Sequence, residues 1–403
     1  MKEQEFLTPL DIVLRRRAKK SFWVFVIVVI IIAVAVYFLW SLKWNAPVAY
    51  ADIEEHFKYG SIGADDITTG IPYWIWKVLP VMFADKLPGE GYESLGFIYE
   101  SGKDLPIGIS KRQFRPLLDS VRFNCALCHT GTLRDTPDSE PRIILGMPPT
   151  SLNLLEFAKF LTVVAHDERF TPQRIMAEID GLGADLGFIE RLAYLYLIIP
   201  AVRDQFITQG SRLAFIERQP DWGPGRVDTF NGYKTTQFNF PVDGLREDEL
   251  FGIVDPPSIW NQKPREGMDL HWDGNNNSVH ERNLSASLGA GVTPPTIDLP
   301  RLKRVEDWIW ELPAPPYPYE INQGLAAKGE EIYRRECASC HDFGGAQVGT
   351  VVPIDEIGTD PGRLDSYTYE LNANQNTLYT GYPWRFKHFR KTNGYANSPL
   401  DGI

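Results

Sequence analysis

The four cysteines of this 403-residue chain all lie in two short motifs, Cys-Ala-Leu-Cys-His at residues 125–129 and Cys-Ala-Ser-Cys-His at residues 337–341. A Cys-x-x-Cys-His motif is the attachment signature of c-type haem. Its two thiols take the vinyl groups of one haem, and the adjacent histidine becomes the proximal ligand of the iron. The sequence therefore predicts two covalent haems, held by Cys125, Cys128 and His129 in the first motif and by Cys337, Cys340 and His341 in the second.

Two other chemistries also use closely spaced cysteines. A Cys-x-x-Cys pair can be a redox-active dithiol, and it can supply half of a zinc site. Here histidine follows each pair directly, and the chain has no further cysteine to complete a zinc site. A structural disulfide across two intervening residues would close too short a loop to stabilise the fold. These alternatives account for the paired motifs less well than haem does.

An uncharged apolar run, residues 22–40, lies near the N-terminus and is long enough to cross a bilayer core of ~30 Å. Basic residues precede this run and acidic residues follow it, so the positive-inside rule places the N-terminus in the cytoplasm. A cleaved signal peptide is the alternative, because Ala49-Tyr50-Ala51 resembles a cleavage site, although a signal peptide usually has a shorter apolar part. We expect a single-pass protein of the bacterial inner membrane with its body in the periplasm, where haem c is attached.

The charge of the chain bears on its partners. The formal net charge is −11, and the basic cluster precedes the apolar run, so the exported part is more acidic still. This balance gives no indication of nucleic-acid binding. An acidic body can attract a basic redox partner, and it also serves solubility alone. We expect a periplasmic or membrane redox partner.

The pattern along the chain predicts a mainly α fold with extensive loops, composed of an N-terminal transmembrane helix and two cytochrome c-like haem domains. Proline and glycine are frequent, which favours loops wrapped around buried haem. The expected parts are a basic cytoplasmic N-terminus (1–21), a transmembrane anchor (22–42), an N-terminal haem domain with a helical insertion (45–312), a proline-rich linker (313–322) and a C-terminal cytochrome c domain (323–403).

Helical periodicity is clearest between the two motifs. One expected helix, near residues 186–199, should stop at Pro200, because proline has no amide hydrogen to donate. After the linker, residues 324–333 predict the opening helix of a cytochrome c domain, with its apolar side packed beside the haem. The four earlier helices are expected near residues 152–161, 172–179, 186–199 and 201–207.

Several segments between and after the motifs resemble the bacterial di-haem cytochrome c peroxidase superfamily. Residues 255–261 (DPPSIWN) and 270–274 (LHWDG) are similar to that family's P-S-hydrophobic-x-N and W-D-G motifs. The resemblance covers roughly residues 105–403 and is closest to the rubber-oxygenase-like branch. It implies that Trp272 lies between the haems and relays electrons, with His271 beside it as a second catalytic candidate. The branch is suggested by residues 225–231, 283–291 and 392–397.

The same resemblance has three departures. Peroxidases of this superfamily carry a glutamate or glutamine shortly after W-D-G, which moves protons during peroxide cleavage. Here residues 288–292 are Leu-Gly-Ala-Gly-Val, although Glu281 lies nearby in the sequence. The basic residue expected after W-D-G is missing, and Asn275-Asn276-Asn277 stand in its place. The chain stops at Ile403, where the family continues, so the expected C-terminal haem domain is incomplete or unusually exposed.

The sixth ligands of the irons stay open at the level of sequence. His388 lies in the C-terminal domain and is a candidate iron ligand there, with the alternative that its basic loop holds haem propionates. Met147 and Met268 are candidate thioether ligands, which would raise the reduction potential, or ordinary packing residues. Guanidinium groups match propionate geometry, and the candidates are Arg122, Arg226 and Arg385.

Two functions follow from these expectations. In the first, the protein is an oxidoreductase, peroxidase- or oxygenase-like, in which a small oxidant such as oxygen or peroxide reacts at the first haem and the second haem supplies electrons. In the second, both irons are six-coordinate and the protein only transfers electrons. A degenerate, truncated gene product is a third interpretation, supported only by the C-terminus.

Overall fold

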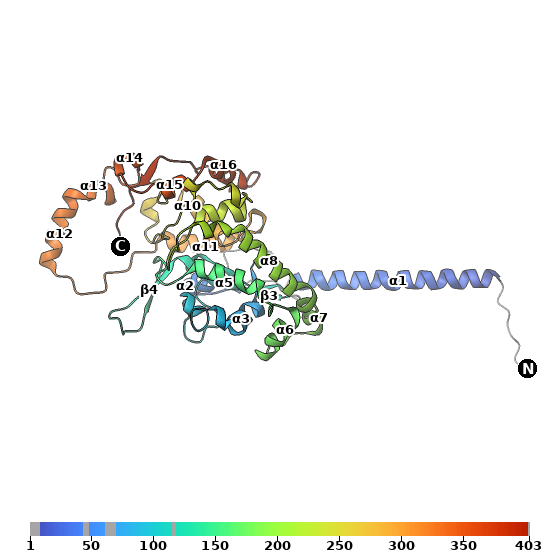
Figure 1. Ribbon diagram of the computed structural model, residues 1–403. Helices are drawn as coiled ribbons and strands as arrows, with labels where there is room; N and C mark the ends of the chain where they lie inside the picture. The colour runs from blue at the N-terminus through green and yellow to red at the C-terminus, as the bar shows by residue number, and fades with distance from the viewer. Residues whose placement is uncertain (1–8, 43–47, 61–69, 115–117, 402–403) are drawn as a thin grey trace, which may run out of the picture.

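The computed structural model describes residues 9–42, 48–60, 70–114 and 118–401, with the side chains of 9–18 and 38–42 left aside. Residues 1–8 of the expected cytoplasmic segment lie outside this range. The N-terminal helix α1 (Pro9–Leu42) extends away from the body (Figure 1). Its stretch Lys19–Tyr37 is long and apolar enough to span a membrane, and these side chains are mostly exposed. The structure thus has one helix of membrane-spanning length and composition among the described residues.

A small antiparallel sheet precedes the first motif. Its strand order is β1 (Ile71–Pro72), β3 (Leu118–Phe123), β2 (Ile109–Phe114), with Ile71 opposite Val121 and Ile109 opposite Phe123. Strand β3 leads through one residue into α4 (Cys125–Cys128), so the sheet sets the position of the first motif.

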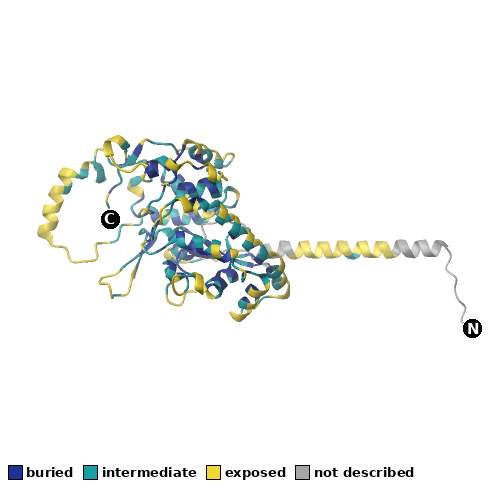
Figure 2. Cartoon of the chain, viewed as in Figure 1, coloured by how far each residue is buried: buried dark blue, intermediate teal, exposed yellow. Residues whose placement is uncertain are grey.

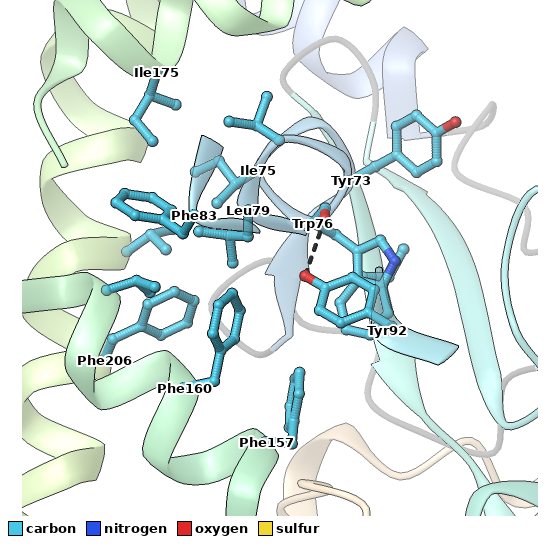
Figure 3. Close-up of a cluster of buried hydrophobic side chains, with 14 of the residues drawn as sticks. Tyr73, Ile75, Trp76, Leu79, Phe83, Tyr92, Phe157, Phe160, Ile175 and Phe206 are labelled. Atoms are coloured by element: carbon cyan, nitrogen blue, oxygen red, sulfur yellow. Dashed lines mark hydrogen bonds between the residues drawn. The ribbon is translucent and has the colours of Figure 1, made fainter. Parts of the chain in front are cut away.

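The first hydrophobic core packs this sheet and α3 (Tyr73–Met82) against helices that follow the motif. Figure 3 shows aromatic rings of this core, in which the Tyr92 hydroxyl donates to the Trp76 carbonyl at 3.0 Å while Phe157 and Phe160 approach from α5. Side-chain caps at Asn153 and Thr171 begin α5 and α6. The helices are α5 (Leu154–His166), α6 (Pro172–Gly181), α7 (Phe188–Ala193), the π-helical η3 (Tyr194–Ile198) and α8 (Ile199–Arg212).

The helix expected to stop at Pro200 instead continues through it. The Ile199 amide donates to the Tyr194 carbonyl in a π-turn, one residue further than an α-turn. A wider turn of this kind accommodates the missing amide hydrogen of Pro200, which then sits near the start of α8. The prediction of helices is confirmed here, and the prediction of a break between them is wrong.

A second hydrophobic core joins residues from both sides of the proline-rich segment 313–322. Phe230 and Leu284 pack in it together with Tyr367 and Phe389. The segment after the linker therefore does not form a hydrophobic core of its own. The helices here are α2 (Ile53–Tyr59), α9 (Thr229–Gly232), α10 (Val279–Gly289), α11 (Leu299–Trp310), α15 (Gly362–Ser366) and α16 (Tyr369–Leu378).

The second motif lies in a thin lobe that bulges from the body (Figure 1). Helix α12 (Gln323–Glu336) leads into α13 (Ala338–His341), and no described residue of either helix is buried. Leu325 and Ile332 on α12 are exposed, so this helix does not pack its apolar side as the sequence led us to expect (Figure 2). Strand β6 (Val351–Pro353) pairs antiparallel with β7 (Gly394–Ala396) and closes the lobe.

The remaining elements are short. They are the paired strands β4 (Thr130–Leu133) and β5 (Arg142–Leu145), helix α14 (Ile354–Ile357), the π-helical η5 (Tyr233–Gln237), and the 3-10 turns η1 (Ala84–Lys86), η2 (Tyr92–Leu95), η4 (Ala214–Arg218), η6 (Val242–Gly244), η7 (Glu247–Glu249), η8 (Lys263–Arg265) and η9 (Pro294–Thr296). The chain is mainly α with extensive loops, as its sequence predicts.

Candidate functional site

The first motif is a single helical turn fixed by its cap. The Asn124 side chain accepts from the Ala126 amide at 2.9 Å and donates to Ser110 Oγ at 2.7 Å and to the Lys58 carbonyl at 3.1 Å. Gly108 packs so closely that a Cβ atom there would lie 2.3 Å from Leu127 Cα, and its φ is +88°. Only glycine meets both conditions, so the loop before β2 and the motif helix are held in close contact.

His129 is oriented by a backbone carbonyl. Its Nδ1 lies 3.0 Å from the Pro257 carbonyl oxygen, which can only accept, so Nδ1 carries the hydrogen. The free lone pair is therefore on Nε2, the arrangement used by histidine ligands of metals. Burial, and then the charge of Arg282, lower the pKa of His129 to about 4. The ring is thus neutral at pH 7, which is the form that can ligate iron.

A cavity of about 290 Å³ lies against the first motif, and its surface is mostly apolar. Cys125, Cys128 and His129 all line it. Burial raises the pKa of Cys125 to about 12 and that of Cys128 to about 11. A reactive dithiol needs a lowered thiol pKa, so the redox-dithiol alternative fits this site poorly. Two thiols and a preset imidazole facing an apolar cavity fit a covalently attached haem.

The second motif repeats the histidine arrangement. His341 Nδ1 lies 2.8 Å from the Ser398 carbonyl oxygen, and the Leu400 amide donates to the His341 carbonyl at 3.1 Å. His341 lines a larger cavity of about 1110 Å³. The thioethers of Met147 and Met268 line the same cavity. Cys337 and Cys340 are not among the described residues that line this cavity, so here the structure brings only the histidine of the motif together with the two methionines.

His271 and Trp272 line both cavities. The Trp272 Nε1 donates to the Asp255 carbonyl at 3.0 Å, which fixes the indole in the wall between them. His271 has a φ of +66°, uncommon for a residue other than glycine. Its buried Nε2 has no hydrogen-bond partner within the part of the chain that the structure describes. Burial, followed by the charges of Arg282 and Arg363, lowers the pKa of His271 to about 3, so this ring is neutral too.

Three residues singled out from the sequence lie elsewhere. Arg226 donates to the Trp222 carbonyl at 3.1 Å and lies 3.3 Å from the Asp255 carboxylate, while Arg385 is exposed. His388 is 2.9 Å from the Glu281 carboxylate. Neither arginine nor His388 is among the described residues that line the two cavities. The structure thus does not bring His388 together with the second motif, because Glu281 holds its loop against α10.

Glu281 itself faces that loop. Its carboxylate accepts from the backbone amides of Lys387 at 2.7 Å and His388 at 3.0 Å, and from Asn276 at 3.2 Å. It therefore holds two segments together and is not among the residues lining the first cavity. A different carboxylate, Glu306 of α11, does line that cavity and accepts from His280 Nδ1 at 2.9 Å.

Sequence reasoning missed the cationic lining of the cavities. Arg282 lines both of them, Arg363 lines the first and Arg265 lines the second. Arg265 pairs with Asp401, and Arg363 donates to Thr229 Oγ1 at 3.1 Å and to the Gly252 carbonyl at 3.2 Å. A usable signal was the helical spacing of the α10 residues that line the first cavity, namely Arg282, Asn283, Ser285, Ala286 and Gly289.

Comparisons with known proteins add little to this geometry. No family model matches the chain. A protein of Sinorhizobium fredii described as uncharacterized protein y4iM is 33% identical over 111 residues, which cover 28% of this chain. The match spans about a quarter, 24%, of that protein's length. No solved structure matches. Among the described residues, no three or more His, Cys, Asp and Glu side chains form a metal-binding group.

Proposed function

We propose that this protein is a di-haem c-type cytochrome, anchored in the bacterial inner membrane by α1, with its body in the periplasm. The first motif would hold a haem for redox chemistry on a small oxidant, and the second motif would hold a haem for electron relay. The proposal agrees with the resemblance to the di-haem cytochrome c peroxidase superfamily. A bound haem would supply iron that exchanges electrons or binds a small oxidant.

The residues of each cavity have distinct tasks in this proposal. Cys125 and Cys128 hold the first haem, and His129 is its proximal ligand because its Nδ1 hydrogen is already committed to Pro257. The second haem is held in the same way by the second motif, with the carbonyl of Ser398 orienting its histidine. Arg282 and Arg363 stabilise propionate charge at the first cavity.

The observation that carries the proposal is the shared wall. Trp272 lines both cavities and is fixed through its Nε1. In this proposal the indole would therefore lie between the two haems. An aromatic ring in that position favours electron transfer between two cofactors. Two independent binding sites would gain nothing from a shared aromatic ring. Glu306, hydrogen-bonded to His280, places a carboxylate at the first cavity.

One observation favours pure electron transfer instead. The unpartnered Nε2 of His271 is a ready sixth ligand, and Met147 and Met268 offer thioethers to the second haem. If these groups occupied the sixth position of both irons, no position would be open to an oxidant.

Carbon monoxide separates the two functions, because it binds only ferrous iron with an open position. Full-length protein carrying haem would be reduced with dithionite and titrated with carbon monoxide, and bound gas would be scaled to total haem. The proposal expects one carbon monoxide per two haems. No binding would overturn it in favour of electron transfer, and two per chain would contradict a six-coordinate relay at the second site.

A matched pair of variants identifies the ligand. His271→Asn keeps a side chain that tolerates positive φ and removes the imidazole, while Trp272→Phe keeps an aromatic ring. Under the proposal neither variant changes the stoichiometry. If His271 is a sixth ligand, His271→Asn alone gains one carbon monoxide per chain. Trp272→Phe should slow electron transfer between the haems in flash photolysis.

A further inference from the structure

An apolar stripe lies on the surface of α7 and η3. Phe188, Ile189, Tyr196 and Leu197 have exposed fractions of 76%, 70%, 71% and 68%, and Leu192 between them is also exposed. We call these five residues the α7 stripe. Single exposed apolar residues are ordinary on protein surfaces, but a contiguous group of large ones marks an interaction site.

The π-turn keeps the stripe on one side of the helix. Phe188, Leu192 and Tyr196 recur every four residues, and Leu197 follows Ile189 by two such steps. In an α-helix that spacing would drift around the axis, but the i→i+5 turn of Tyr194–Ile198 returns Tyr196 and Leu197 to the side of Phe188. The opposite side carries the fully buried Tyr194. The backbone thus aligns the exposed residues at one outer face.

The stripe lies at the end of the body from which α1 leaves. In Figure 1, α7 lies at the level where the membrane-length helix meets the body, whereas α12 lies at the opposite end. If α1 crosses the bilayer, this end of the body faces the lipid. Apolar residues with tyrosine at that level have the composition of a segment that inserts into the membrane interface.

We propose that the α7 stripe docks into the outer surface of the lipid bilayer that α1 crosses. The inference rests on the proposed anchoring by α1. A second contact beside a single helix would fix the tilt of the body and hold the haem cavities at a constant height above the membrane. Lipid is the occupant because the stripe is continuous with the membrane-facing end of the molecule.

The test asks whether the body stays on lipid after its anchor is cut. A protease site is inserted between Asn45 and Ala46, and full-length protein with haem is reconstituted into vesicles of phosphatidylethanolamine and phosphatidylglycerol. After cleavage, vesicle flotation measures the bound fraction of the body. We expect most of the body to float. Leu197→Ser should lower the bound-to-free ratio roughly tenfold, the effect of withdrawing one large apolar side chain from lipid, and the combined Phe188→Ser, Ile189→Ser, Tyr196→Ser and Leu197→Ser variant should abolish flotation.

The controls separate the possible failures. Leu325→Ser on α12 combined with Tyr369→Ser on α16 removes exposed apolar residues outside the α7 stripe and should float like the parent protein. Release of the parent body to the same extent as the four-site variant would overturn the proposal. Uncut protein that fails to float would instead refute anchoring by α1. A parent body that dimerises in lipid-free solution, with a monomeric variant, would assign the stripe to a second copy and also overturn the proposal.

Discussion

The two Cys-x-x-Cys-His motifs have the same local chemistry but very different surroundings. In both, histidine Nδ1 is held by a backbone carbonyl, at 3.0 Å in the first and 2.8 Å in the second. The first is anchored on a sheet, capped by a buried asparagine and enclosed by two hydrophobic cores. The second lies on α12 and α13, which contribute no buried residue, and only its His341 lines the second cavity, which is about four times larger.

This difference indicates how much of each site the protein builds by itself. Buried apolar residues stabilise the first site without a cofactor. In the second, a haem would fill space that the chain leaves open, and its attachment would contribute much of the order of the lobe. We therefore expect the first site to unfold only when the whole body unfolds. The second site should unfold locally, while the rest of the body stays folded.

The largest expected effect concerns a buried ion pair whose lysine follows Tyr233, a residue that lines the first cavity. Lys234 is fully buried, and its Nζ lies 2.6 Å from the Glu249 carboxylate. Lys234→Met would leave that carboxylate buried without its partner, which costs about 3–5 kcal/mol of unfolding free energy. Urea unfolding followed by circular dichroism should show one global transition at lower denaturant.

The matched control replaces both partners. Lys234→Met with Glu249→Leu removes the uncompensated charge and should recover most of the loss. If the single variant unfolded only locally, or lost less than about 1 kcal/mol, the account of a rigid, globally coupled first site would be wrong.

A smaller and local effect is expected at the second site. Asp401 accepts from Asn261 Nδ2 at 2.5 Å and pairs with Arg265, while its carbonyl accepts from Trp260 at 3.1 Å. Asp401→Asn removes charge-assisted hydrogen bonds, with a local cost of about 1.5–3 kcal/mol. Hydrogen exchange of the Leu400 amide, which bonds to His341, should speed up while the global urea midpoint stays unchanged.

Asp355→Asn, an exposed position in α14, serves as the control and should leave that exchange rate unaltered. A global loss of stability in Asp401→Asn, comparable to that of Lys234→Met, would mean that the two sites are not energetically separate.

The smallest effect concerns pH at the first cavity. The hydrogen bond to Glu306 raises the pKa of the partly exposed His280. A raised folded pKa stabilises the protein below the unfolded value of about 6.5, and this contribution is lost as pH rises through the folded pKa. His280→Gln should therefore remove at most about 0.5 kcal/mol of stability at pH 5 and nothing at pH 9. His166, bonded to a backbone carbonyl, is the control for substitution to glutamine. A larger loss of stability at pH 9 than at pH 5 would contradict the expected direction of this pH dependence.

Local signals in the sequence predicted much of the fold. The expected segments 152–161 and 172–179 correspond to helices α5 and α6. They could be predicted because helical period, capping residues and apolar spacing depend only on residues close together in the sequence. The sequence could not reveal the π-turn before Pro200. It also could not show that Tyr367 and Phe389 return to the core of Phe230, since that packing depends on contacts far apart in the chain.

The candidate site likewise contains some residues that local sequence predicts and others that only the fold brings together. Both Cys-x-x-Cys-His motifs and the position of Trp272 followed from contiguous residues or resemblance, and the structure places Trp272 on both cavities. Arg226, Arg385 and His388 were chosen for their residue type, and they bind other groups or face solvent. The lining arginines Arg282 and Arg363 come from separate elements, and only the fold brings them together.

The number of haems attached to each chain tests the central claim most directly. The full-length protein would be produced with a periplasmic haem-attachment system, and intact mass would be measured under denaturing conditions, where only covalent haem remains. We predict two haems per chain, one in Cys125→Ser/Cys128→Ser and one in Cys337→Ser/Cys340→Ser. A chain that carries no covalent haem, or carries haem on one motif only, would contradict this account.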